Sequence, residues 1–165
     1  MKNQWIFWVA MAAYALHMME EFFYDWKNWA NHVLHLPVEW SGFYVTNTAV
    51  LFMGIACGSV GWSLPWFALS FPALMLINAF FFHVLPFIRT KKFSPGLITA
   101  IVLFFPVGIY SFHLAMEMGI QPKEIGIAML TGILMMAFPI VLLKTRNLPF
   151  FSQTGPVEKP TIRKN

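Results

Sequence analysis

The sequence predicts an all-α integral membrane bundle, and three observations support this fold class. Of the 165 residues, 58% are hydrophobic and only 11% are charged, whereas soluble domains carry about 25% charged residues. Phenylalanine occupies 18 positions and tryptophan 7, which is more apolar surface than a soluble chain of this length can bury. The apolar residues also gather in five runs, each close to the roughly 20 residues that a membrane-spanning helix needs.

Five transmembrane helices are therefore expected, at residues 5–23, 41–60, 65–88, 96–116 and 123–143. Pro65, Pro95 and Pro122 stand near the starts of three of these helices, where a missing backbone donor costs little. The first run is interpreted as a retained helix, because it continues well past any small-residue cleavage site of a signal peptide. Cys57, the single cysteine, lies in the second run and is expected to serve packing.

Residues 24–39, between the first two spans, are too polar to cross a membrane. Their apolar side chains recur at helical spacing, with polar residues between them: Trp26, Trp29, Val33 and Leu36. This pattern predicts a short helix lying in the membrane interface and anchored by tryptophan. His32 and His35 are expected on its surface. The transmembrane domain is assigned to residues 1–146, and the polar residues 147–165 to a flexible cytoplasmic tail.

The basic residues predict the orientation of the chain. If it crosses five times, nine of the eleven basic residues fall on one face: Lys27, Arg89, Lys91, Lys92, Lys144, Arg146, Lys159, Arg163 and Lys164. Cytoplasmic loops carry the excess of Lys and Arg, so the N-terminus is predicted outside and the C-terminus in the cytoplasm. Membrane topology thereby explains the net charge of +4 without a nucleic-acid partner. The expected partner is the lipid bilayer, and a homodimer stays open.

The stretch "ALHMMEEFF", residues 15–23, places one histidine and two glutamates in an otherwise apolar run. With about 100° per residue, His17, Glu20 and Glu21 share one helix face. Side chains of this kind are costly in hydrocarbon and normally face a bundle interior or a wet cavity. These three residues are therefore candidates for a functional site.

Other spans carry polar residues at a similar depth, nearer the cytoplasm: Asn47, Asn78, His83 and Thr99. Asn78 and His83 are five residues apart and would lie roughly 140° apart on a regular helix. Both face one pocket only if the helix is distorted, and Pro86 and Pro72 supply a cause for distortion.

His113 and Glu117 form a separate pair at i,i+4 spacing near the outer end of the fourth span. This pair is expected to make a local hydrogen bond. Its role is left open by the sequence.

Four stretches together resemble a known group of proteins. They are "HMMEE" at 17–21, "TNT" at 46–48, "NAFFFH" at 78–83 and "SPGLITA" at 94–100, and their order resembles the bacterial HXXEE-domain membrane proteins. The resemblance covers most of residues 10–140 and implies a location in the bacterial inner (plasma) membrane. It also implies that the functional residues are His17, Glu20, Glu21, Asn78 and His83. That family is functionally uncharacterised, with a suspicion of enzymatic activity.

A looser similarity of architecture and residue types links the chain to the emopamil-binding sterol isomerases. These also combine histidine, glutamates and asparagine in a lipid-accessible cavity of five spans. No stretch of sequence aligns, so the similarity serves as an analogy only.

Three kinds of chemistry suit these residues, and the preferred one is an acid–base enzyme acting on a lipid or other apolar substrate in a cytoplasm-facing cavity. Glu20 or Glu21 would donate a proton, tuned by His17. Adjacent carboxyl groups resist simultaneous ionisation, so one of them is expected to hold a proton at neutral pH. His83 and Asn78 would position the substrate or relay a second proton.

The second hypothesis is a divalent metal, zinc or iron, bound by His17, Glu20, Glu21 and His83 in a membrane hydrolase or oxidase. The asparagines would support these ligands, and Asn47 and Thr99 are the supporting polar residues in every version. The third is a proton-coupled carrier or small-molecule binding protein, because intramembrane carboxylates and histidines also build proton relays. Haem held by two histidines is a further alternative.

Overall fold

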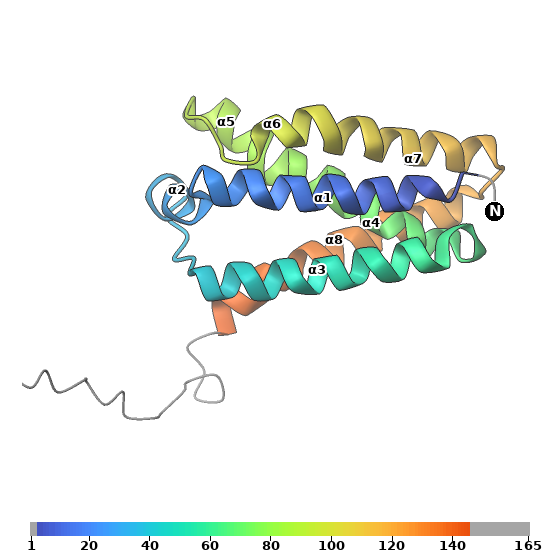
Figure 1. Ribbon diagram of the computed structural model, residues 1–165, viewed down its shortest axis with the longest axis horizontal. Helices are drawn as coiled ribbons and strands as arrows, with labels where there is room; N and C mark the ends of the chain where they lie inside the picture. Colours follow the sequence, from blue (N-terminus) through green and yellow to red (C-terminus); the bar gives the residue numbers. More distant parts are fainter. Residues whose placement is uncertain (1–2, 146–165) are drawn as a thin grey trace, which may run out of the picture.

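The computed structural model of the protein describes residues 3–145, and all regular structure among them is helical (Figure 1). The all-α prediction is confirmed for these residues. The long helices lie along the longest axis of the molecule, with α1 in contact with α3 on one side and α7 on the other. The tail predicted at 147–165 lies outside the described residues.

The described residues form five helical rods, the first two joined by residues 24–39 and the others by short turns. The first is α1 (Trp5–Phe23), and the second is α3 (Trp40–Val60), which ends in the 3₁₀ turn η1 (Gly61–Ser63). The third runs through α4 (Pro65–Asn78), the π-helical η2 (Ala79–Val84) and α5 (Leu85–Thr90). The fourth runs through α6 (Leu97–Thr99), the π-helical η3 (Ala100–Phe104) and α7 (Phe105–Glu117). The fifth is α8 (Pro122–Thr145).

Four of these rods, and not the predicted five, are long and apolar enough to cross a membrane: 40–63, 65–90, 97–117 and 122–145. The predicted first span forms α1, which falls short by composition. Its polar residues, above all His17, Glu20 and Glu21, lower its mean hydropathy. The four apolar rods are consistent with a membrane protein.

The segment between α1 and α3 contains the short helix α2 (Trp26–Val33). Asp25 precedes it with positive φ, and its carboxylate accepts a hydrogen bond from the backbone N–H of Asn28 at 3.3 Å. This is the N-cap that a short helix needs, because its first N–H groups have no partner inside the helix. A helix within residues 24–39 is therefore confirmed, while its position at a membrane interface stays a prediction.

Both π-helical segments end two residues before a proline. Pro86 follows η2, and Pro106 follows η3. Proline lacks an N–H and its ring clashes with the carbonyl four residues earlier, and a π-helical turn is one way in which a helix accommodates such an irregularity. The distortion anticipated near Pro86 is present, in the form of a wider helical turn. It rotates every side chain that follows relative to those before it.

The outer surface of the bundle is apolar. Half or more of the side chain is exposed in Phe23, Phe52, Val102 and Leu134, among others. α4 is the most buried rod and packs tightly on α8, where a Cβ on Gly132 would lie 2.8 Å from that of Ala73. The polar side chains of the candidate site described below are buried between the rods, so the bundle has a polar centre inside an apolar exterior.

Candidate functional site

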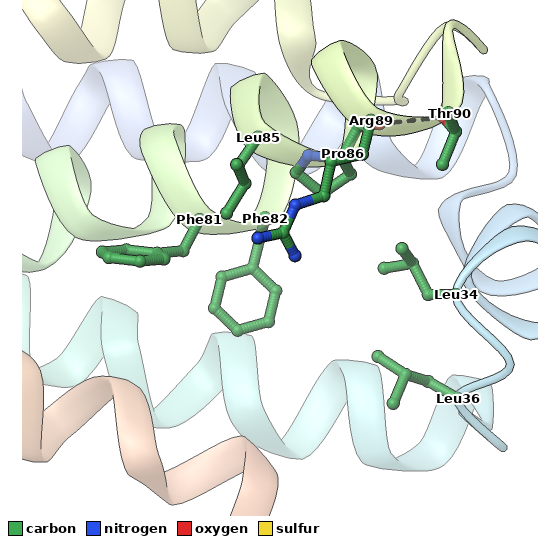
Figure 2. Close-up of a pocket in the computed structure, with 8 residues that line it drawn as sticks. All are labelled: Leu34, Leu36, Phe81, Phe82, Leu85, Pro86, Arg89 and Thr90. Carbon is green, nitrogen blue, oxygen red and sulfur yellow. Dashed lines mark hydrogen bonds between the residues drawn. The ribbon is translucent and has the colours of Figure 1, made fainter.

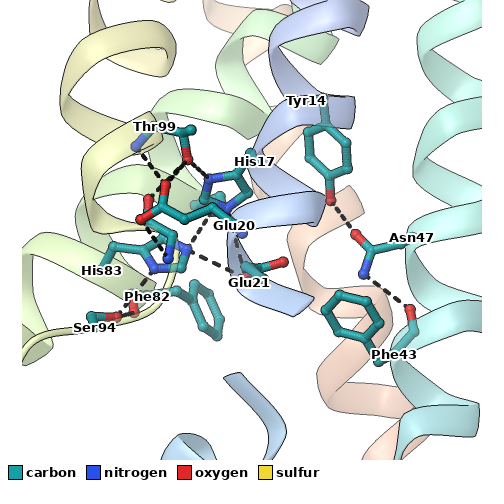
Figure 3. A network of polar contacts seen from close by, with 12 residues as sticks. Tyr14, His17, Glu20, Glu21, Phe43, Asn47, Phe82, His83, Ser94 and Thr99 are labelled. Atoms are coloured by element: carbon teal, nitrogen blue, oxygen red, sulfur yellow. Dashed lines mark hydrogen bonds and ion pairs between the residues drawn. The ribbon is translucent and has the colours of Figure 1, made fainter. Parts of the chain in front are cut away.

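The second half of α1 turns its polar face into the bundle. His17 is 1% exposed, Glu20 8% and Glu21 6%. Figure 3 shows these side chains reaching toward the start of the fourth rod and toward η2. The three side chains share one face directed at the other helices. The sequence predicts that they face a common cavity, but of the three only Glu21 lines the cavity described below.

Glu20 binds the beginning of the fourth rod. One carboxylate oxygen accepts hydrogen bonds from the backbone N–H groups of Gly96 and Ile98, at 3.1 and 3.0 Å. The other oxygen accepts from the N–H of Thr99 at 2.7 Å and from its hydroxyl at 2.5 Å. The first N–H groups of a helix need such an acceptor, and the helix dipole favours a negative charge there. Glu20 therefore acts as a helix cap, and both of its oxygens are occupied.

Thr99 joins Glu20 to His17. Its hydroxyl lies 2.8 Å from Nδ1 of His17. A hydroxyl has one proton to donate, and the shorter contact with the Glu20 carboxylate takes it. The hydroxyl oxygen must then accept from an Nδ1–H of His17. Nε2 of His17 is left with its lone pair, and it is buried without a hydrogen-bond partner.

The π-helical turn brings His83 and Asn78 together. Nε2 of His83 lies 3.0 Å from Oδ1 of Asn78, and Nδ1 lies 3.2 Å from the hydroxyl of Ser94. A π-helix places residues five apart above one another. The roughly 140° separation expected on a regular helix is thereby removed, and His83 is fully buried.

The two histidines meet at Glu21. Nε2 of His17 lies 3.7 Å from Oε1 of Glu21, and Nε2 of His83 lies 3.6 Å from the same oxygen. The imidazole rings stand edge to face with centroids 4.7 Å apart. The three ligand atoms lie within 4.8 Å of one another, a group able to hold a metal ion. Metal–ligand bonds near 2.1 Å in a tetrahedral zinc shell place the ligand atoms about 3.4 Å apart, close to the 3.7 and 3.6 Å that separate the two Nε2 atoms from Oε1 of Glu21.

Gly96 makes this approach of the two rings possible. Its φ is +93°, a conformation that L side chains rarely adopt. A Cβ at this position would lie 2.5 Å from Cε1 of His83 and 2.7 Å from Cε1 of His17. A glycine is therefore required both by the backbone turn and by the close passage of the chain past the histidines.

A cavity of about 730 Å³ opens beside the cluster, between α1, α3, η2 and α8. Glu21 and Tyr14 of α1 line it, together with Asn47 of α3 and Asn78 at the end of α4. The Tyr14 hydroxyl donates to Oδ1 of Asn47 at 3.0 Å (Figure 3). Most of the remaining wall is apolar. His17, Glu20, His83 and Thr99 are not among the lining residues, so Glu21 and Asn78 connect the histidine cluster to the cavity.

The predicted residues thus divide into three groups. His17, Glu21 and His83 form the cluster, with Asn78 beside it. Glu20 and Thr99 support the cluster through the hydrogen bonds that link Glu20 to Thr99 and Thr99 to His17. Asn47 lies apart, on the cavity wall.

Two residues of the site were missed by sequence reasoning as individual participants, Ser94 and Gly96. Both belong to the stretch "SPGLITA". The Pro-Gly pair signalled a turn, but nothing in the sequence showed that this turn passes over two histidines.

His113 and Glu117 make the local contact that their spacing predicts. Nε2 of His113 lies 3.3 Å from Oε1 of Glu117, and the two side chains are 54% and 59% exposed. They lie on α7, with no other histidine or carboxylate bonded to them among the described residues. The pair is separate from the cluster.

Comparison with known proteins identifies the family. The model of the family described as "Protein of unknown function with HXXEE motif" matches residues 8–111. The chain belongs to this family. No curated protein and no solved structure matches it, so the similarity to emopamil-binding isomerases gains no support. The HXXEE motif corresponds to His17, Glu20 and Glu21, and in this chain its second glutamate joins the cluster while its first caps a helix.

Proposed function

We propose that this HXXEE protein is a membrane-embedded, metal-dependent enzyme acting on a lipid-like substrate, with His17, Glu21 and His83 as metal ligands. The observation that carries the proposal is the convergence of two imidazole Nε2 atoms on one carboxylate oxygen, at 3.7 and 3.6 Å. Two imidazoles and one carboxylate suit zinc or iron(II). Three protein ligands with an open position are typical of catalytic rather than structural metal sites.

The surroundings of the cluster support this assignment. Metal-binding histidines usually donate their other N–H to a neighbouring acceptor, which fixes the tautomer and the ring orientation. Thr99 accepts from Nδ1 of His17 in this way and is itself held by Glu20. The Ser94 hydroxyl lies 3.2 Å from Nδ1 of His83, while Nε2 of His83 donates to Oδ1 of Asn78 at 3.0 Å, and a metal bound at Nε2 would replace that hydrogen bond. Glu20 and Thr99 are thus positioning residues.

The cavity supports a substrate of low polarity. Its volume of about 730 Å³ falls in the range of about 300–1,000 Å³ found for small-molecule sites. Glu21 and Asn78 belong both to the cavity wall and to the cluster, so a substrate in the cavity meets the site at these two side chains. A metal at the cluster would polarise a bound water or substrate oxygen. Oδ1 of Asn78 is bound to Nε2 of His83, and its Nδ2 group, 4.0 Å from the Met136 sulfur, would donate to the substrate.

The membrane placement that we favour includes α1 as a fifth span. Its exposed side chains are apolar, for example Leu16, Met19 and Phe22, and its polar residues face the other rods. The mean hydropathy of α1 averages its apolar outer face with its polar inner face, so by this measure α1 is too polar to cross a membrane. α2, the turn after α5 and the end of α8 lie at one end of the bundle (Figure 1). The basic residues near this end support an orientation in which it faces the cytoplasm of a bacterial cell, with α2 in the interface.

A second candidate is acid–base catalysis without a metal. It is favoured by the position of Glu21, which lines the cavity between two histidines and can exchange a proton with a bound substrate. Glu20 does not suit the role of proton donor, since its two oxygens accept four hydrogen bonds.

Metal analysis of the purified protein separates the two candidates. The wild type in mild detergent is loaded with Zn²⁺ or Fe²⁺, passed through a desalting column, and its metal content measured. We expect about one ion per chain, lost in His17→Ala, Glu21→Gln and His83→Ala. His113→Ala and Glu117→Gln serve as matched controls that keep the ion. A wild type that binds no metal at the cluster would refute the metalloenzyme and favour the acid–base candidate.

A further inference from the structure

A second, smaller depression of about 300 Å³ lies between the α2–α3 connection and the η2–α5 segment. Its walls are mainly apolar, with Leu34 and Leu36 on one side and Phe81 and Phe82 on the other (Figure 2). Arg89 also lines it, and Figure 2 shows the guanidinium group turned toward Phe82. This groove therefore combines an apolar floor with one positive charge.

No carboxylate among residues 3–145 forms an ion pair with Arg89. The ion pairs found among residues 3–145 all involve histidine, and Arg89 belongs to none of them. The other polar side chain of the groove, Thr90, donates its hydroxyl proton to the carbonyl of Pro86 at 2.8 Å. The guanidinium is thus the group in the groove with donors to offer a ligand.

From these features we infer that the groove binds the headgroup of an anionic membrane lipid. A guanidinium group presents a planar fork of donors that matches a phosphate diester. The neighbouring leucine and phenylalanine side chains would contact the beginning of the acyl chains. A free phosphate ion gains nothing from these apolar walls, so the groove is specific for a phosphate attached to an apolar body.

The groove adjoins the large cavity. Leu36 and Phe82 line both of them, so a lipid held at Arg89 has an acyl chain next to the cavity that contains Glu21 and Asn78. This assigns an anionic lipid as the substrate class. The assignment as substrate rests on the proposed function, whereas the binding site itself does not.

The test uses the full-length protein in nanodiscs of phosphatidylcholine, with or without added phosphatidylglycerol. Native mass spectrometry then counts the phosphatidylglycerol molecules that stay bound. We expect wild type to retain this lipid and Arg89→Gln to bind it about tenfold or more weakly, the usual effect of losing hydrogen bonds to a charged group. Arg89→Lys keeps the charge without the fork and should fall between the two.

Two further variants make the result specific. Lys92→Gln removes the same charge two residues beyond α5 and should bind the lipid like wild type. Leu34→Trp fills the groove without changing charge and should weaken binding. Equal losses in Arg89→Gln and Lys92→Gln would indicate general attraction to an anionic surface and overturn the inference, as would undiminished binding in Arg89→Gln.

Metal content measured on the same samples keeps this proposal distinct from the preceding one. If the protein binds metal but Arg89→Gln binds the lipid as well as wild type does, only the lipid site in the groove is contradicted. A protein without metal that still depends on Arg89 for lipid binding would contradict the metalloenzyme and support the lipid site.

Discussion

The chain contains two histidine–glutamate pairs with the same i,i+4 spacing, and they differ in almost everything else. Nε2 of His17 and Oε1 of Glu21 lie 3.7 Å apart, and the two side chains alone are 1% and 7% exposed. The same two atoms of His113 and Glu117 lie 3.3 Å apart, and these side chains are more than half exposed. In the buried pair, both side chains also face His83. Spacing alone therefore does not identify a site. What distinguishes the buried pair is a further histidine from another helix, His83, and a tautomer of His17 that is fixed by Thr99.

The largest effect is expected where the buried pair depends on the backbone that passes over it. Gly96→Ala would place a Cβ 2.5 Å from His83 and 2.7 Å from His17, in addition to the strain of a positive φ. We expect a loss of about 3 kcal/mol or more in the free energy of unfolding, since strain and overpacking add. Thermal unfolding in detergent measures it.

Gly119→Ala is the matched control for this substitution. Gly119 also has positive φ, +75°, but open space surrounds its Cβ position. Backbone strain alone predicts a loss of about 1–2 kcal/mol. Equal losses at the two glycines would contradict the close approach of Gly96 to the histidines.

Glu20→Gln tests the cap behind the buried pair. The amide keeps the shape but replaces one acceptor oxygen with a donor that faces backbone N–H and hydroxyl groups. We expect a loss of about 2–3 kcal/mol in unfolding free energy, because buried donors lose their partner. Glu117→Gln, on the exposed pair, should stay within about 0.5 kcal/mol. A stable Glu20→Gln protein would argue against the capping role.

Thr99→Val sharpens the comparison further, since it separates Glu20 from His17 without changing the volume greatly. Loss of a group that orients a metal ligand typically weakens metal binding by about 10–100-fold. Zinc titration against a competing chelator measures this change. Thr99→Ser should restore the affinity, and Thr131→Val, on exposed α8 surface, should leave it unchanged. A Thr99→Val protein that binds zinc with wild-type affinity would contradict the role of Thr99 in orienting His17.

The smallest effect is expected at the exposed pair itself. His113→Ala removes one solvent-exposed contact, and such helix pairs contribute about 0.3–0.5 kcal/mol. Neither metal content nor lipid binding should change, as native mass spectrometry can establish. A loss of metal in this variant would mean that the two pairs do not differ in the way proposed.

Much of this arrangement follows from the sequence. The apolar runs predict the helical rods, and the polar face of α1 predicts which side chains turn inward, because burying them among helices is the alternative to exposing them to lipid. The same polar face makes α1 too polar for a composition test, although its outer surface is apolar. Whole-segment averages hide such a division.

Other features depend on contacts that no local pattern encodes. The wide turn at Ala79–Val84 brings Asn78 and His83 together, and a proline signals distortion without specifying its form. The two adjacent glutamates looked equivalent in sequence. Their different roles arise because Glu20 meets the N-terminus of another helix while Glu21 meets two histidines.

The central claim is that the buried pair, together with His83, binds a metal ion. X-ray absorption spectroscopy of the zinc-loaded protein tests it most directly. The account predicts a nitrogen and oxygen shell at about 2.0–2.2 Å, with the scattering pattern of two imidazoles. His83→Ala should lose this pattern together with the bound zinc, whereas His113→Ala should keep both. A spectrum with no imidazole, or one that changes with His113 and not with His83, would contradict it.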